Sequence, residues 1–580
     1  MKLKLLLLTI SAFISAQLAV QLTDSYQNKQ LIKSISSYKQ KTVLRCGPDW
    51  EALKAILEET DIPPVPGAGN YKWKISTKND SAQFYFNQGM NMYYGFHIIE
   101  AMASFRKAEK FDPDCAMLHW AKALAYGPNI NDLGYAASPD ALLAVNKAAE
   151  LNASCTAVEK ALIEAQQIRY SSDSTQAREH LNQLYADRMK AIYEQFPAHA
   201  DAAALYADAL MLQHPWDLWF TNGNPKPWTP KIRSVLEKLL KNTPSHPGAN
   251  HYYIHVMEPS PFASLAIPSA DRLGSLTPAL SHMVHMPSHI YLRTGNYNKG
   301  GLVNEKAVDS YQKMIPLYSA VTGNDFLYII HNLHMQTNHA MLAGKMKYAV
   351  KSGEATANSI PKDYLTMEDA LGSYIQYIYM TTVFVDIRFG RWDALLAQKK
   401  PDEKQVYATI LYHFGKGMAQ ANKKNLTAAR DELDQIKQLL KDSSLYLPFL
   451  PFSPSIEGAE IAARLLEGTI ALKEKNYATA IVHFSKASAS EEQMVYNEPR
   501  DWILNPRHYL GNAYLENKQW KEAEITFRND LTNNNNNIWA LTGLHTSLLK
   551  QQKQTEAEKL LIKIKQATAE TDVKISAAVF

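Results

Sequence analysis

Several features that mark other protein classes are scarce in this chain of 580 residues. Its three cysteines, Cys46, Cys115 and Cys155, exclude a disulfide framework and allow at most one bridge, and simple burial of all three thiols fits equally well. Its 61 basic and 57 acidic residues leave a formal net charge of +4. This balance gives no electrostatic reason to expect a nucleic-acid partner, because phosphate binding needs a basic surface.

Several catalytic sequence motifs are also missing. There is no H-E-x-x-H run, no G-x-S-x-G turn, no phosphate-binding loop and no dinucleotide fingerprint. The sequence therefore gives no support to a zincin protease, a serine hydrolase, an NTP-dependent enzyme or an NAD-dependent enzyme.

Long apolar runs are absent apart from a short one at the N-terminus. A basic start at 1–4, an apolar run at 5–14 and the small pair Ser15-Ala16 form the pattern of a secretory signal. The run is short for a membrane span, and no later segment reaches about 18 uninterrupted apolar residues. We expect a signal peptide at 1–16 and an exported protein, periplasmic or secreted, with no transmembrane segment after signal removal. An uncleaved anchor is the alternative.

Amphipathic helical patterns dominate the chain from residue 81 onward. One stretch carries a repeat signature, because Gly89 is followed by Ala101, Phe105, Ala108 and Pro113. These are the small, aromatic and helix-ending positions of a 34-residue tetratricopeptide (TPR) repeat, in which two antiparallel helices approach closely at the small residues.

The same spacing recurs from Gly468 to Phe484 and from Gly511 to Phe527. The chain thus resembles the TPR superfamily, which implies an all-α fold, an irregular TPR-like α-solenoid of antiparallel helix pairs. We expect an N-terminal extension and linker at 17–80 and the solenoid at 81–580. The clearest repeats are expected at 82–115, 281–307, 330–356, 461–494 and 504–537.

Histidines gather in three short segments of the central chain. In the first, His251, His255 and Glu258 stand at i, i+4 and i+7 and so share one helical face. The following Pro259 and Pro261 predict that this helix ends at Glu258.

Two further histidine sets follow the first along the chain. His282, His285 and His289 stand at i, i+3 and i+7, and His331 and His334 stand at i and i+3. Each set shares one helical face.

The repeat registers aim these sets in the same direction. With the repeat register anchored on Gly300, the second histidine set falls at positions 2, 5 and 9 of the repeat's first helix. With the next register anchored on Ala349, His331 and His334 fall at positions 2 and 5, and Asn338 falls at position 9. In the superfamily, these positions line the concave groove. Pro287 should kink the helix of the second set, and His339 points away from the shared face of the third.

Convergent imidazoles on adjacent helices predict a metal site, as does a carboxylate at the end of one of those helices. The three histidine sets together offer more ligands than one tetrahedral ion needs, so either two ions bind or some of these side chains orient the ligands instead of binding the metal. Asp217 and Asp271 are further candidates for orienting an imidazole. Zinc is the default ion, with copper and iron as alternatives. Affinity should fall below about pH 6, because neutral imidazole is the ligand form. The candidate metal ligands are His251, His255, Glu258, His282, His285, His289, His331 and His334.

Segments 248–261, 270–297 and 497–516 together resemble a family of large bacterial TPR proteins, which implies the fold but no particular chemistry. The hypothesis is an exported TPR-repeat protein with a histidine-rich metal site in its concave groove. As a metal-dependent enzyme it would need an open coordination position, with Glu258 as the catalytic acid or base. The alternative is a TPR scaffold that binds a peptide or protein partner in this groove, without metal or catalysis.

Overall fold

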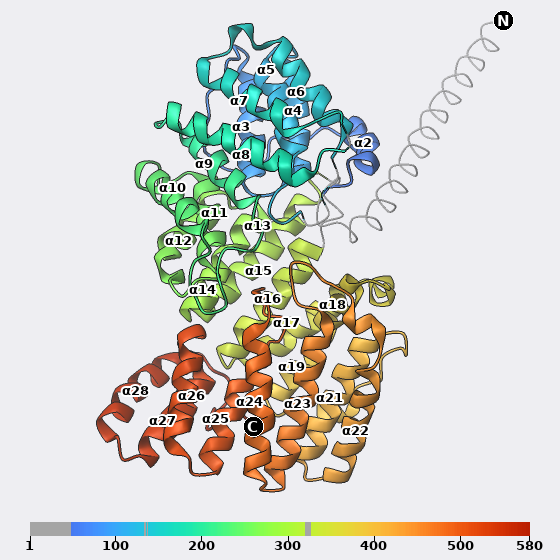
Figure 1. Ribbon diagram of the computed structural model, residues 1–580, viewed down its shortest axis with the longest axis vertical. Coiled ribbons are helices and arrows are strands. Elements are labelled where there is room, and N and C mark those ends of the chain that lie inside the picture. Colours follow the sequence, from blue (N-terminus) through green and yellow to red (C-terminus); the bar gives the residue numbers. More distant parts are fainter. Residues whose placement is uncertain (1–47, 133–134, 136, 174, 319–325) are drawn as a thin grey trace, which may run out of the picture.

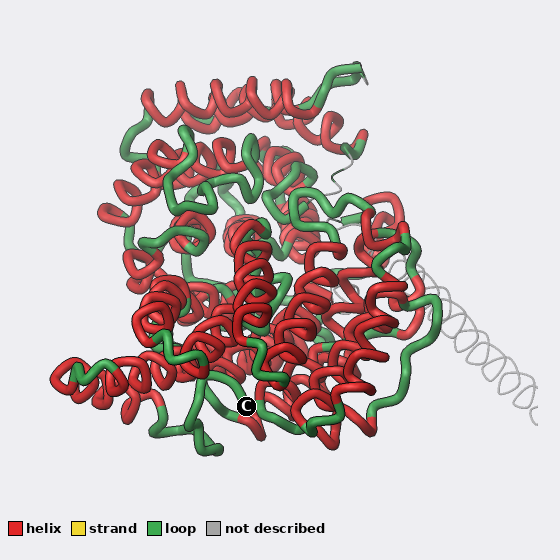
Figure 2. Tube along the Cα trace, turned by 60° about the horizontal axis from the view of Figure 1, so that its bottom comes forward, coloured by secondary structure: helices red, strands yellow, loops and turns green. Residues whose placement is uncertain are grey.

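The fold is known from a computed structural model. It describes residues 48–132, 135, 137–173, 175–318 and 326–580. Within these ranges the chain consists of helices joined by loops, and the sole strand-like feature is an isolated bridge between Trp219 and Pro225; Figure 2 shows this all-helical trace. None of the described helices is long and apolar enough to cross a membrane. The all-α prediction is confirmed.

The expected signal peptide lies outside the described residues, as do residues 17–47 of the expected extension and Cys46. Cys115 and Cys155 are buried free thiols. The described part of the extension packs into the fold, because the ring of Trp73 lies 5.6 Å from Phe86 and 5.3 Å from Trp120. This segment therefore belongs to the core that follows it.

Two main hydrophobic cores divide the molecule into two lobes. The first core draws on residues from Leu53 to Tyr328, and the second on residues from Ile330 to Trp539. Figure 1 shows the N-terminal lobe above the C-terminal lobe. The helices of the N-terminal lobe are α2 (Trp50–Glu59), α3 (Asp80–Tyr94), α4 (Ile98–Phe111), α5 (Ala116–Ala125), α6 (Pro139–Glu150), α7 (Ala157–Arg169), α8 (Arg178–Gln195), α9 (Ala200–Met211), α10 (Thr229–Asn242), α11 (Pro247–Met257), α12 (Ile267–Leu276), α13 (Ser281–His285), α14 (Pro287–Thr294) and α15 (Tyr297–Met314).

The C-terminal lobe continues the pattern of paired helices. Most successive helices pack against each other, and α15 packs on α16 where the lobes meet. The helices of this lobe are α16 (His331–Leu342), α17 (Met346–Ser359), α18 (Ala370–Tyr379), α19 (Thr381–Arg388), α20 (Trp392–Ala397), α21 (Val406–Asn422), α22 (Leu426–Leu439), α23 (Ser455–Lys473), α24 (Tyr477–Gln493), α25 (Pro506–Glu516), α26 (Trp520–Asn533), α27 (Ile538–Lys550) and α28 (Gln554–Ala567).

The repeat spacing read from the sequence corresponds to one contact that recurs in three hairpins. A Cβ added at Gly89 would lie 2.4 Å from the ring of Phe105, and one added at Gly468 would lie 2.5 Å from the ring of Phe484. Gly511 and Phe527 repeat the contact at 2.5 Å. The aromatic ring thus fills the space that the missing side chain leaves, and this close approach fixes the helix pair.

Replacing Gly468 with Ala is expected to destabilise the fold by about 1–3 kcal/mol, because the new methyl group overlaps the buried Phe484 ring. Gly274→Ala is the matched control, since Val284 Cα is the nearest atom to its added Cβ, at 4.0 Å. The control should be neutral or stabilising by up to about 1 kcal/mol. Denaturant unfolding measures both, and equal effects would contradict the packing account.

Candidate metal centre

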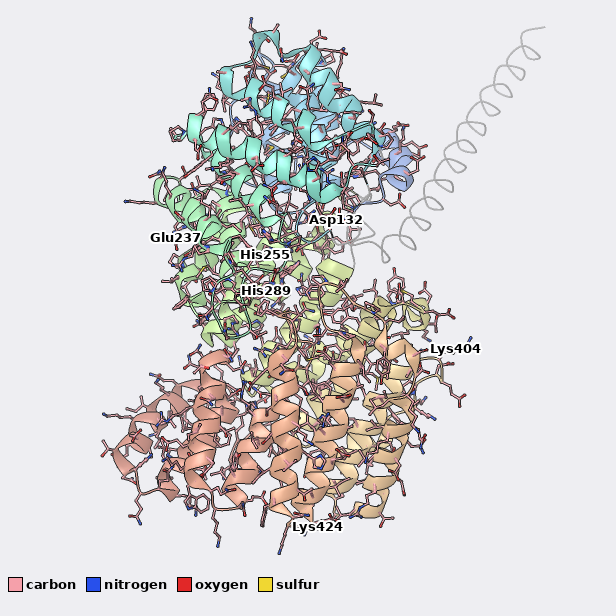
Figure 3. The ribbon with its side chains drawn as sticks, viewed as in Figure 1. Asp132, Glu237, His255, His289, Lys404 and Lys424 are labelled. Carbon is pink, nitrogen blue, oxygen red and sulfur yellow. The ribbon has the colours of Figure 1, made fainter. Side chains whose placement is uncertain are left out.

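The histidine segments meet where the two lobes join. Figure 3 shows His255 and His289 at this junction. Helix α11 ends at Met257 with Glu258 as its cap, as its prolines predict. The kink predicted at Pro287 coincides with the boundary between α13 and α14, which falls between the second and third histidine of that segment.

His251, His255 and His282 form the first histidine group. One potential ligand atom from each lies within 4.8 Å of the others. The ring of His251 is 4.8 Å from that of His255 and 5.0 Å from that of His282. Nitrogens around a tetrahedral zinc ion lie about 3.4 Å apart, so small rotations would close this group on one ion.

Hydrogen bonds fix which nitrogen faces inward in two histidines of the first group, His251 and His255. Nδ1 of His251 donates to the carbonyl oxygen of Tyr94 at 2.6 Å, and Nδ1 of His255 donates to Glu258 Oε1 at 2.9 Å. The Nε2 atoms of His251, His255 and His282 have no hydrogen-bond partner among the described residues. Buried polar atoms without partners are costly, and a lone pair held inward by an outer hydrogen bond is the arrangement of metal-bound histidine.

Phe96 covers the first group and was missed by the sequence analysis. Its ring centroid lies 4.6 Å from that of His251, 6.0 Å from His255 and 5.7 Å from His282. Its φ of 57° places it in the left-handed turn between α3 and α4. The equivalent turn in a later hairpin uses the lysine Lys424, so an aromatic residue turned inward at this position is a departure from the repeat.

His285, His289 and His331 form the second histidine group. Nε2 of His285 lies 2.7 Å from Nε2 of His289 and 3.1 Å from Nε2 of His331. His331 comes from α16, so this group draws on both lobes. The ring of His285 is 5.8 Å from that of His282, which makes the two groups immediate neighbours.

The two inner nitrogens of His285 and His289 lie 2.7 Å apart, so a proton or a metal ion must lie between them. Asn304 donates Nδ2 to the Gly300 carbonyl at 2.8 Å, which leaves Oδ1 to accept from Nδ1 of His285 at 2.7 Å. Nδ1 of His289 likewise faces carboxylate oxygens. Both Nε2 atoms then carry lone pairs, which repel each other unless a proton or a metal ion lies between them.

Two buried carboxylates hold the outer nitrogens. Oε1 of Glu258 lies 2.9 Å from Nδ1 of His255, and Oε2 lies 2.9 Å from Nδ1 of His289. One carboxylate side chain therefore contacts both histidine groups. Glu498, which the sequence analysis missed, places Oε2 at 2.7 Å from Nδ1 of His289. Glu258, predicted as a ligand and as a catalytic acid or base, therefore contacts two imidazoles through its two oxygens.

Burial and neighbouring charges set the ionisation of these groups. Burial opposes the charged form of His289, but Glu258 outweighs it and raises the pKa of His289 to about 10. Burial also opposes the ionisation of Glu258, but His289 and His255 outweigh it and lower the Glu258 pKa to about 2. Burial raises the pKa of Glu498 despite its hydrogen bond with His289. Without a metal ion, His289 and Glu258 thus form a charged pair.

Four other ligand candidates are held in the neutral form by burial. Burial lowers the pKa of His251, His282 and His285 well below the usual histidine range, and burial lowers that of His331 to about 3. Because neutral imidazole is the ligand form, these four groups remain available below pH 6. In the second group, however, a metal ion must displace the proton of His289, whose pKa is raised to about 10, so affinity there still falls as the pH falls, and the loss expected below about pH 6 stays a prediction.

His334 does not join either group. It shares a helix face with His331, but its ring lies 5.7 Å from that of Tyr377 in the C-terminal lobe, and neither ring nitrogen has a partner among the described residues. Nor do the predicted orienting acids reach an imidazole, since Asp217 pairs with Lys226 and Asp271 accepts from Tyr291. Glu258, Glu498, Asn304 and the Tyr94 carbonyl take that role.

Acid should destabilise the fold partly through His334, whose pKa burial lowers to about 3. An unfolded histidine titrates near 6.5, so this contribution to stability is complete above pH 6.5 and is lost as the pH falls toward 3. His334→Leu should flatten the dependence of the unfolding free energy on pH in this window. Denaturant titrations in chelator measure the slope. The exposed His180→Leu should keep the wild-type slope, and an unchanged slope in His334→Leu would refute the assignment.

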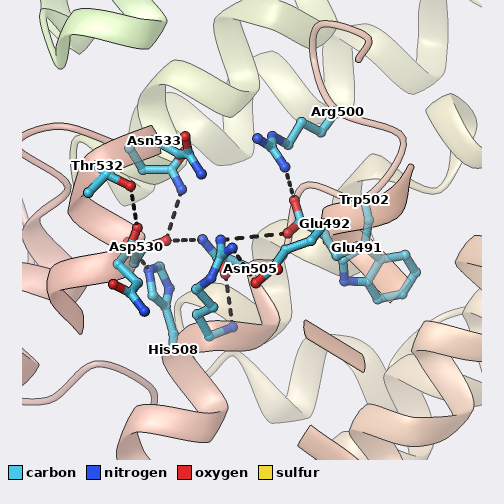
Figure 4. Close-up of polar contacts among 12 residues, drawn as sticks. Glu491, Glu492, Arg500, Trp502, Asn505, His508, Asp530, Thr532 and Asn533 are labelled. Carbon is cyan, nitrogen blue, oxygen red and sulfur yellow. Dashed lines mark hydrogen bonds and ion pairs between the residues drawn. The ribbon is translucent and has the colours of Figure 1, made fainter. Parts of the chain in front are cut away.

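A polar network supports the segment that carries Glu498. Figure 4 shows Arg500 paired with Glu491, and Asn505 bonded to Asp530. His508 adds a contact from Nε2 to Asp530 Oδ2 at 3.1 Å. These contacts tie the loop before α25 to α24 and α26, and so hold Glu498 against the N-terminal lobe.

Comparisons with known proteins extend this description little. No family model matches the chain, and no curated protein matches it. The human IFIT1 dimer with m7Gppp-AAAA is 12% identical over 86% of this chain and 92% of that chain, with a TM-score of 0.30. Yeast Tom70 is 12% identical over 94% of this chain and 95% of the Tom70 chain, with a TM-score of 0.28. The matching chain of the APC/C hetero-tetramer Cut9–Hcn1 is 14% identical over 90% of this chain and 78% of that chain, with a TM-score of 0.25. Superpositions this loose transfer no ligand or partner.

Proposed function

We propose that the chain binds two transition metal ions side by side at the lobe junction, one in each histidine group. The observation that carries this proposal is the convergence of three imidazoles in each group, all buried except the partly exposed His331, while hydrogen bonds to Tyr94, Glu258, Asn304 and Glu498 hold outer Nδ1 atoms. Outer-nitrogen acceptors of this kind orient metal-bound imidazoles.

Zinc is the proposed ion, with copper and iron as competitors, because imidazole ligands suit all three. Three imidazoles leave a tetrahedral ion with one open position, as in catalytic rather than structural zinc sites. A bound zinc ion would supply a Lewis acid that lowers the pKa of a coordinated water to about 7. Glu258 would hold one imidazole of each group, which makes it a positioning residue rather than the acid or base.

The burial of the histidines weighs against the alternative in which they contact a peptide in an open groove. His251 is 0% exposed and His289 is 5% exposed. An extended peptide needs such side chains at the surface. A helical-repeat scaffold could still bind a partner elsewhere, but these histidines would then have no part in it.

Metal content tests the proposal directly. Protein without an affinity tag is stripped with a chelator, dialysed against zinc, copper(II) or iron(II) separately at neutral pH, and analysed by mass spectrometry of the metal. We expect two equivalents of the preferred ion per chain. Less than about 0.2 equivalents of every ion would leave the groups as a hydrogen-bonded core and refute the proposal.

A further inference from the structure

Helix α13, which carries His282 of the first histidine group, begins without a cap of its own. Leu280 occupies the capping position and makes no side-chain hydrogen bond to the helix. The first N–H groups of a helix have no partner within that helix, and leaving them unpaired in a buried setting is costly. The backbone N–H of His282 is one of these groups, so it needs a partner from another segment.

His97 supplies this partner from the turn between α3 and α4. Its Nε2 lies 3.3 Å from the backbone nitrogen of His282, 185 positions along the chain. Because a backbone N–H can only donate, Nε2 of His97 carries the lone pair and the ring proton is on Nδ1. Nδ1 donates to Glu100 Oε1 at 2.7 Å, which fixes this tautomer. Both side chains are buried, so bulk water does not compete for these contacts.

Imidazole caps at helix starts recur in this chain. Nδ1 of His199 accepts from the N–H of Ala202 at 3.2 Å at the start of α9, and Nδ1 of His246 accepts from the N–H of Ala249 at 3.1 Å at the start of α11. Each of these histidines directly precedes the helix that it caps. His97 also directly precedes a helix, α4, but its side chain makes no cap bond there. Its acceptor nitrogen serves α13 instead.

The plane of the His97 ring is fixed as well. Tyr328, just before α16, stacks on this ring with centroids 4.8 Å apart and planes 6° apart. The hydroxyl of Tyr328 donates to the carbonyl oxygen of Phe96 at 3.4 Å. Phe96, whose ring covers the first group, is the neighbour of His97 in the chain. The turn between α3 and α4 therefore contacts the first group twice, through the Phe96 ring and through the His97 imidazole.

We infer that His97 is a positioning residue of the first histidine group, because it fixes the start of α13 and so holds the His282 imidazole against its partners. The inference rests on the proposed function. Ligand side chains must be held to within about 0.5 Å of their working positions, and His282 lies in the first turn of a helix of only five residues. His97 acts through His282 rather than as a ligand, since the backbone N–H occupies its Nε2 lone pair.

Cobalt(II) binding to His97 variants provides the test. The background is His331→Gln protein, in which only the first group should bind metal. His97→Phe keeps a ring against Tyr328, His97→Leu substitutes a smaller apolar side chain, and both lack an acceptor. In both we expect the cobalt affinity to fall about 10–100-fold, and the visible spectrum, which depends on coordination geometry, to change. His97→Gln restores an acceptor oxygen, so its affinity should lie within about threefold of the background.

His199→Phe is the matched control, because it removes an imidazole cap from α9, a helix that carries no ligand candidate. Its cobalt affinity and spectrum should equal those of the background. An unchanged affinity and spectrum in His97→Phe and His97→Leu would overturn the inference, as would equal weakening in His97→Gln. Failure of the background protein to take up cobalt would contradict the proposed function, whereas cobalt uptake that these variants leave unaltered would contradict the inference alone.

Discussion

Glu258→Gln is expected to weaken metal binding in both histidine groups at once, by about 10–100-fold in each. One carboxylate contacts Nδ1 of His255 in the first group and Nδ1 of His289 in the second, at 2.9 Å each. Glutamine keeps one acceptor oxygen but presents an amide N–H to the other imidazole, so at least one ring loses its orientation and basicity. Competition with a chromophoric chelator at neutral pH measures both affinities.

The chain offers a matched control for this change. Glu432 accepts from Nδ1 of His413 at 2.5 Å, a similar carboxylate–imidazole contact far from both groups. Glu432→Gln should leave both affinities within about twofold of the wild type. Weakening of only one group by Glu258→Gln would contradict the bridging role of this carboxylate.

Single histidine replacements should each remove one of the two equivalents. His251→Gln should abolish binding in the first group and leave the second intact, because the inner nitrogens of the second group come from His285, His289 and His331. His331→Gln should do the reverse. Metal analysis of each variant after loading gives the stoichiometry, and the expected value is one equivalent in each.

His483→Gln serves as the control for these replacements, since His483 pairs with Glu467 at 2.9 Å and belongs to neither group. It should retain two equivalents. Loss of both equivalents in His251→Gln or in His331→Gln would instead indicate one shared centre, and retention of both in the two variants would place the metal elsewhere.

Much of the fold follows from local sequence patterns. The spacing from Gly468 to Phe484 predicts a helix hairpin, and the structure shows the close contact between them. The shared face of His251 and His255 is also a local property of one helix, so the period of 3.6 residues per turn predicted it.

The rest of the site depends on contacts between distant segments. Glu498 lies 209 positions after His289, on a loop of the other lobe, and nothing in its local pattern predicts where it meets an imidazole. His334 shares a face with His331, yet the packing of α16 places it beside Tyr377. The residues that share one helix face can be predicted from the sequence. Which helix faces contact each other, and how deeply they are buried, depends on how the two lobes pack together.

The most direct test of the central claim is a crystal structure of the zinc-loaded protein with anomalous scattering data collected on both sides of the zinc edge. The account predicts two zinc peaks at the lobe junction, each about 2.0–2.1 Å from the Nε2 atoms of one histidine group. A zinc-loaded crystal with no peak there, or with peaks only on surface side chains, would contradict it.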